Sequence, residues 1–125
     1  MGVFDDLAAL QPLPIWDGIA ARAVESERLT LSVVELDPDA VIPDHAHENE
    51  QVGLLLTGSM RFRVGDETRD AVPGTTWAIP ANVPHDVVVG PEGAVVVEVF
   101  APRREDWRAI ARGEPRPPRW PSAAE

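Results

Sequence analysis

A succession of short strand-like runs, separated by glycine, proline and acidic turn residues, constrains the fold of this chain more than any other feature. Residues 60–64, for example, alternate apolar and polar side chains, as a strand with one buried face does. Many short strands at regular spacing indicate an antiparallel sandwich or barrel, whereas an α/β fold would interleave strands with helices. We therefore predict an all-β chain that forms an antiparallel sandwich or barrel.

The same punctuation divides the chain into strands, turns and flanks. Strands are expected at residues 21–24, 29–36, 41–47, 52–56, 60–64, 77–79, 85–89 and 94–100. The apolar run 52–56 ends at 57–58, and a turn is expected at 90–93. Residues 105–112 carry acids first and arginine near the end, which favours a short C-terminal helix. We expect residues 1–24 to be an N-terminal lead-in segment packing on the barrel, residues 25–104 to be the barrel, and residues 105–125 to be the helix and an extended tail rich in proline and arginine.

Composition limits the partners and the metal chemistry of the protein. A chain of 125 residues is expected to form one domain. Its formal net charge of −10 argues against binding to nucleic acid or anionic membrane. No apolar run approaches the roughly 20 residues that span a bilayer, and the N-terminus lacks the pattern of a secretory signal. The chain has no cysteine, so a metal site must use nitrogen and oxygen donors, and a cytoplasmic location is expected.

The three histidines of the chain suggest one shared site. Alternate residues of a strand point to the same side, so His45 and His47 would turn both imidazoles toward one ion. If residues 48–50 form a hairpin loop, Gln51 returns beside His47 and offers its amide oxygen. His85 follows a proline-bounded corner and would have to arrive from another strand pair. The His-X-His pair alone is a weak indicator, because a lone histidine is more often a hydrogen-bonded core or surface residue.

The sequence around these histidines resembles the two motifs of the cupin family. Residues 45–58 are similar to the first motif, with Gln51 where many cupins have glutamate. Residues 80–85 are similar to the second motif, PxGxxH, with Asn82 in the place of glycine, and asparagine tolerates the left-handed conformation well. The resemblance implies a single-domain monocupin, an all-β cupin barrel with an antiparallel jelly-roll fold. It also implies that the barrel holds one divalent transition metal ion, with Zn, Ni, Fe, Mn and Co all suited to the donors. The implied ligands are His45, His47, Gln51 and His85.

Two side chains bear on the type of chemistry. An amide ligand leaves the charge of a metal ion intact, whereas a carboxylate cancels one unit of it, so Gln51 favours a strong Lewis acid and non-redox chemistry. Glu98 is the single charge in the apolar run 94–100. If buried, it would have a raised pKa suited to proton transfer. The alternatives are a barrel-mouth carboxylate paired with an arginine, or a solvent-facing edge residue.

Residues 98–106 also resemble the end of the barrel in the KdgF-like cupins, which act on unsaturated monouronates, and small cupins of polyketide pathways share similar motifs. In KdgF-like cupins this strand carries Asp, Phe and Arg at spacings matched by Glu98, Phe100 and Arg104. The resemblance implies that Glu98 is the catalytic acid or base and that Phe100 and Arg104 bind the substrate, with Arg104 clamping its carboxylate. Glu98 extends the carboxylate by one methylene, which alters the placement on which proton transfer depends.

These features predict a metal-dependent cupin enzyme of lyase, isomerase or cyclase type, acting on a small oxygen-rich substrate such as a uronate-like sugar or a polyketide. The alternatives are an Fe(II)-dependent dioxygenase and a non-catalytic cupin that binds a metal and a small ligand. The run at 52–56 is apolar on both faces, so its outer face needs a cover, either from residues 1–24 or from a second subunit. We predict a homodimer.

Overall fold

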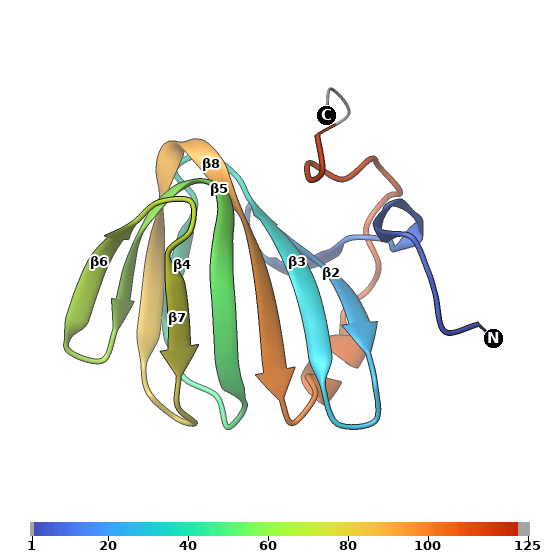
Figure 1. Cartoon of the computed structure of the whole chain (residues 1–125), viewed down its shortest axis with the longest axis horizontal. Helices are drawn as coiled ribbons and strands as arrows, with labels where there is room; N and C mark the ends of the chain where they lie inside the picture. Colours follow the sequence, from blue (N-terminus) through green and yellow to red (C-terminus); the bar gives the residue numbers. More distant parts are fainter. Residues whose placement is uncertain (1, 123–125) are drawn as a thin grey trace.

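The computed structural model describes residues 2–122, which form eight β-strands and two short 3-10 helices (Figure 1). The strands are β1 (Leu13–Trp16), β2 (Ile19–Glu25), β3 (Thr30–Leu36), β4 (Val41–His45), β5 (Glu50–Val64), β6 (Glu67–Ala71), β7 (Thr76–Ile79) and β8 (His85–Ala101). The 3-10 helices are η1 (Leu7–Ala9) and η2 (Glu105–Ala109). Every strand pair among these residues is antiparallel, which confirms the predicted all-β fold.

The two longest strands, β5 and β8, tie the jelly roll together because each takes part in both of its sheets. They pair with each other along most of their length. The C-terminal half of β8 and the N-terminal half of β5 lie in one sheet with β1, β2, β3 and β7. The other halves lie in a second sheet with β4 and β6. All eight strands are hydrogen-bonded into one sheet, and its two parts, here called the two sheets, are joined through the shared strands β5 and β8.

The chain bends between the two sheets at two places where the sequence predicted a strand end or a turn. We expected a strand to end at 57–58 and a turn at 90–93, but β5 and β8 continue through these positions with shifts in register. Gly58 has a φ of +85°, and a Cβ atom at this position would lie 1.9 Å from the carbonyl oxygen of Gly93. These glycines permit a close approach of the two backbones at an irregular bend, and the pairing resumes beyond it.

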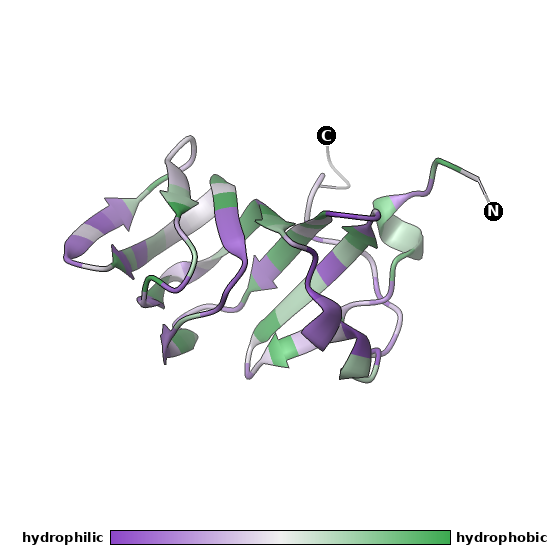
Figure 2. Cartoon of the chain, turned by 90° about the horizontal axis from the view of Figure 1, so that it is seen from below, coloured by the Kyte–Doolittle hydropathy of each residue, from purple (hydrophilic) through white to green (hydrophobic). Residues whose placement is uncertain are grey.

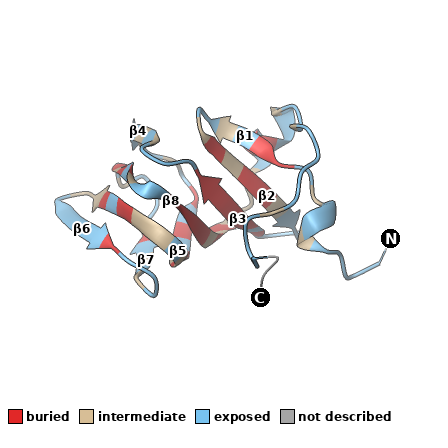
Figure 3. Ribbon diagram, turned by 90° about the horizontal axis from the view of Figure 1, so that it is seen from above, coloured by how far each residue is buried: buried red, intermediate tan, exposed pale blue. Residues whose placement is uncertain are grey.

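Apolar side chains from the two sheets face one another and form the core. Figure 3 shows buried residues concentrated along β3, β5 and β8, whereas β6 is mostly exposed. Figure 2 shows the same contrast in hydropathy, with β6 mostly hydrophilic. The largest fully buried apolar side chains are Leu13, Ile19, Leu36, Leu55 and Ile79. The core thus lies between the sheets and includes residues from the N-terminal strands.

The flanks of the chain lie against the barrel. The predicted lead-in segment contributes β1 and β2, and β2 pairs with β3 over its whole length. Beyond η2, the tail runs without helix or strand past the buried carboxylate of Glu35. Glu35 accepts hydrogen bonds from Nη1 of Arg116 (2.5 Å) and from the backbone N–H of Arg119 (2.8 Å). Residues 123–125, the end of the predicted tail, lie outside the described part of the chain.

The C-terminal helix is shorter and tighter than the sequence predicted. Instead of a helix over 105–112, η2 is a 3-10 helix that ends at Ala109. Its buried Trp107 packs edge-on against Phe100, with ring centroids 5.2 Å apart, and the N–H of Gly113 donates to a backbone carbonyl of the N-terminal segment. An α-helix of eight residues is marginal on its own. The contacts of Trp107 and Gly113 with the rest of the protein fix the course of the chain here instead. Among residues 2–122, no helix has the length and hydrophobicity needed to cross a membrane.

Candidate metal centre

Two strand ends bring the three histidines together. His45 is the last residue of β4 and is paired with His85, the first residue of β8, while His47 lies two residues beyond β4. The ring centroids are 4.3 Å apart for His45 and His85, 5.0 Å for His47 and His85, and 5.7 Å for His45 and His47. One ring nitrogen from each histidine lies within 4.8 Å of the other two. The corner before His85 contains Asn82 at a φ of 65°, the left-handed conformation predicted for an asparagine in place of glycine.

Backbone carbonyls select the tautomer of each histidine. Every Nδ1 atom lies 2.9 Å from a carbonyl oxygen two residues away, in the pairs His45–Pro43, His47–Asn49 and His85–Val83. A carbonyl oxygen can only accept, so each Nδ1 carries the proton and each Nε2 keeps its lone pair. Histidines that bind metals commonly have such a partner on the other ring nitrogen. The three Nε2 atoms are therefore prepared to act as ligands.

Burial favours the neutral form of two of these rings, His47 and His85. His85 is 3% exposed, and its Nε2 is buried without a hydrogen-bond partner among the described residues. Burial lowers the pKa of His85 to about 4, and burial followed by the positive charge of Arg104 lowers the pKa of His47. A buried lone pair without a partner is costly, and a bound cation would satisfy it. The donor set thus fits a divalent transition metal ion.

Gln51 supplies an oxygen at the same point, although the chain does not take the expected route. Its Oε1 lies 3.1 Å from Nε2 of His47, and the side chain is buried. The predicted hairpin at 48–50 is wrong, because β4 pairs with β8, whereas β5 pairs with β6, β7 and β8. Residues 46–49 instead cross from one sheet to the other. Gln51 meets His47 because β5 begins where this crossing ends.

Glu98, on β8, faces the interior beside Gln51. Its side chain is 9% exposed, and Oε2 accepts hydrogen bonds from Nε2 of Gln51 and from Nε1 of Trp77, the latter at 3.0 Å. Burial raises the pKa of Glu98, while these two hydrogen bonds and the positive charge of Arg104 act against the rise. Because the amide nitrogen of Gln51 donates its hydrogen bond to Glu98, the amide oxygen points toward His47. Glu98 therefore fixes the orientation of the Gln51 amide.

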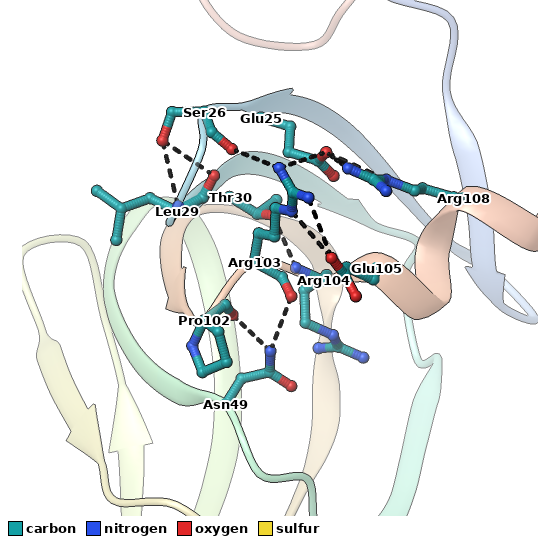
Figure 4. A network of polar contacts seen from close by, with 10 residues as sticks. All are labelled: Glu25, Ser26, Leu29, Thr30, Asn49, Pro102, Arg103, Arg104, Glu105 and Arg108. Carbon is teal, nitrogen blue, oxygen red and sulfur yellow. Dashed lines mark hydrogen bonds and ion pairs between the residues drawn. The ribbon is translucent and has the colours of Figure 1, made fainter.

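Two residues that sequence reasoning missed hold this arrangement in place. The indole of Trp77, on β7, lies against β5 at Gly53, where a Cβ atom would come within 2.3 Å of Nε1. A glycine inside an apolar strand was the available sign of such a close approach. Asn49 is buried and donates from Nδ2 to the carbonyl oxygen of Pro102 at 2.5 Å (Figure 4). The backbone carbonyl of Asn49 accepts a hydrogen bond from Nδ1 of His47. Asn49 thus ties the crossing segment to the end of β8.

Phe100 and Arg104 lie close to the histidines, but Arg104 already has an anionic partner. Phe100 is buried and packs edge-on to His47, with ring centroids 5.9 Å apart. The guanidinium of Arg104 lies over Phe100, with Cζ 4.8 Å from the ring centroid. Its Nε and Nη2 donate to the carboxylate of Asp106 at 3.1 and 2.9 Å. Figure 4 shows the neighbouring Arg103 turned the other way, toward acidic side chains at the surface.

A cavity of about 200 Å³ adjoins the histidine cluster. The polar side chains in its lining are His45, Gln51, His85, Glu98, Arg104 and Asp106. The remaining lining residues are aliphatic, aromatic or methionine. Three of the candidate ligands, His45, Gln51 and His85, therefore face one space together with Glu98, and this space is large enough for a small molecule.

The jelly-roll fold and its histidine cluster define a cupin. The cupin domain family matches residues 32–100, and the chain belongs to this family. The match includes the three histidines, Gln51 and Glu98.

Known cupins similar to this chain include members of the two groups that the sequence had suggested. The pectin degradation protein KdgF of Dickeya dadantii (strain 3937) is 28% identical over 93 residues, which cover 73% of this chain and 84% of KdgF. The structure of KdgF from Halomonas sp. has a TM-score of 0.77 at 27% identity, covering 85% of this chain and 98% of that one. The polyketide cyclase RemF from Streptomyces resistomycificus has a TM-score of 0.71 at 26% identity, covering 82% and 80%. The predicted likeness to KdgF-like and polyketide-pathway cupins is confirmed.

Proposed function

We propose that this cupin is a metal-dependent enzyme of lyase, isomerase or cyclase type that acts on a small oxygen-rich substrate without redox chemistry. One observation carries the proposal: three imidazole nitrogens and an amide oxygen converge beside a buried carboxylate, and two of the histidines, the amide and the carboxylate line one cavity. A histidine cluster that served only stability would need no adjoining cavity. The names of the relatives, a pectin degradation protein and a polyketide cyclase, support chemistry of this class.

The proposed ligands of the ion are His45, His47, His85 and Gln51. All four would be neutral, so a bound divalent ion would keep its full charge and would polarise a carbonyl or hydroxyl oxygen of the substrate. No carboxylate is among these ligands to stabilise a higher oxidation state, which supports the non-redox assignment. Zn, Ni, Fe, Mn and Co all accept imidazole and oxygen donors.

Three further side chains have proposed roles at the substrate. Glu98 transfers a proton, because its carboxylate lies inside the barrel beside a ligand and two donors fix its orientation. Phe100 forms part of the wall on which the substrate rests. Arg104 orients an anionic group of the substrate, and to do so it must share its guanidinium with Asp106 or release it.

The test compares the wild-type protein with Glu98→Gln. The variant amide can still accept the hydrogen bond from Gln51, so we expect one metal ion per chain by elemental analysis in both proteins. Turnover, followed by NMR on unsaturated uronates and poly-β-carbonyl compounds, should be lost in Glu98→Gln, because an amide cannot carry the proton. The matched control Glu92→Gln removes an exposed carboxylate from the same strand and should leave both measurements unchanged.

The other outcomes separate the alternatives. Turnover that survives in Glu98→Gln with unchanged metal content contradicts the role given to Glu98. Substrate-dependent oxygen uptake that requires Fe(II) would support a dioxygenase instead. Metal-dependent ligand binding without any product would support a non-catalytic binding cupin.

A further inference from the structure

The cavity beside the histidine cluster is walled mainly by apolar side chains that come from strands of both sheets and from the segment around η2. Its larger apolar lining residues include Trp16, Met60, Phe62, Phe100, Trp107 and Ile110. The ring of Trp16 lies 5.3 Å from that of His45, so the aromatic surface begins next to the proposed metal ligands. A substrate that reaches the ion would therefore lie against aromatic and aliphatic surface.

The polar side chains of the lining are already engaged with one another. Gln51 donates to Glu98, and Glu98 accepts from Trp77 as well. Arg104 uses Nε and Nη2 on Asp106, and its guanidinium face is stacked on aromatic rings. The histidines are committed to the proposed ion. Few groups in this wall are therefore available to replace the water that a polyhydroxylated ligand would lose.

This wall discriminates between two kinds of oxygen-rich substrate. Each hydroxyl buried without a partner weakens binding by roughly 10- to 100-fold, and a sugar acid carries several. A flat ring gains from the same wall, because aromatic pairs pack edge-on or offset. An apolar cavity of roughly 150 Å³ holds benzene. The cavity of about 200 Å³ is therefore suited to one substituted ring.

We propose that the substrate is a compact, flat molecule with one aromatic or conjugated ring and adjacent oxygen donors, and that it is not a polyhydroxylated sugar acid. Its oxygens face the histidine cluster, and its ring lies against Trp16, Phe100 and Trp107. This inference rests on the proposed metal site and names the substrate class for it.

The test is calorimetric and needs no knowledge of the reaction. The zinc-loaded full chain is titrated with salicylate and, separately, with galacturonate. Each compound has one carboxylate, and the carbon next to the one that bears it carries a hydroxyl. We expect salicylate to bind at least tenfold more tightly. Ile15→Ser places a hydroxyl in the cavity wall at a half-buried position and should weaken salicylate binding roughly fivefold, with unchanged zinc affinity. Val72→Ser, exposed and outside the lining, is the matched control and should change neither value.

The outcomes distinguish this inference from the proposal on which it rests. If zinc binds at one ion per chain but galacturonate binds as tightly as salicylate, or neither ligand binds, the substrate class is wrong and the metal site stands. If Ile15→Ser leaves salicylate binding unchanged, the ligand does not occupy this cavity and the inference is overturned. If the chain takes up no zinc, the metal site fails, and this inference fails with it.

Discussion

Replacing Gly53 by alanine should disturb the candidate site from a position that touches none of the histidines. The added Cβ would lie 2.3 Å from Nε1 and 2.4 Å from Cε2 of Trp77, and a rigid indole can only move away as a whole. Such overpacking costs about 1–3 kcal/mol, and losing the hydrogen bond from Trp77 to a buried carboxylate costs about 1.5–3 kcal/mol. Alanine recovers about 0.5–1 kcal/mol relative to glycine in a strand. The expected net loss is about 3 kcal/mol.

Thermal unfolding followed by circular dichroism measures this loss, which should lower the Tm by about 10 °C in a domain of this size. Zinc affinity should fall about 10- to 100-fold, because Glu98 loses the hydrogen bond from Trp77 and then orients the amide of Gln51 less firmly. Gly2→Ala is the control, since no atom lies closer than 3.9 Å to its added Cβ. If Gly53→Ala keeps both the Tm and the zinc affinity of the wild type, the indole does not pack on β5 as described.

Two further predictions concern acid stability and assembly. The pKa of His85 in the folded protein is about 4, below the ordinary value of 6.5, so as the pH falls the unfolded chain binds a proton at this residue before the folded chain does. The metal-free protein should therefore lose up to about 3 kcal/mol of stability as the pH falls from 6.5 to 4. Urea denaturation at several pH values measures this slope, which should be smaller in His85→Gln; a flat profile in the wild type would refute the cause given. The homodimer stays a prediction: Val24, Leu31 and Val52 lie in one row across the outer face of the sheet and are 51%, 41% and 54% exposed. Light scattering should report a dimer for the wild type and a monomer for Val52→Glu, and a wild-type monomer at micromolar concentration would contradict this assignment.

Much of the fold followed from local patterns in the sequence. Alternation at 60–64 identified the C-terminal third of β5, and turn residues located the hairpin between β2 and β3. Glycine was the ambiguous signal, because it marks both turns and close approaches of two backbones. At Gly58 it serves a close approach to Gly93, so a strand that the sequence divided is continuous in the structure.

The candidate site was only partly predictable, because its supporting contacts join residues far apart in the chain. Spacing brought His45 and His47 together, and the resemblance to cupin motifs added His85. Whether the chain forms a hairpin loop at 48–50 or a crossing at 46–49 depends on which strand pairs with β4, and the local sequence pattern does not contain that information. The same holds for Trp77, whose role depends on two other strands.

The most direct test of the account is anomalous diffraction from crystals of the zinc-loaded protein at the zinc absorption edge. We expect one strong peak per chain, roughly 2.0–2.2 Å from Nε2 of His45, His47 and His85 and from Oε1 of Gln51. A peak bound through Nδ1, a peak elsewhere in the chain, or no peak at all in a zinc-saturated crystal would contradict it.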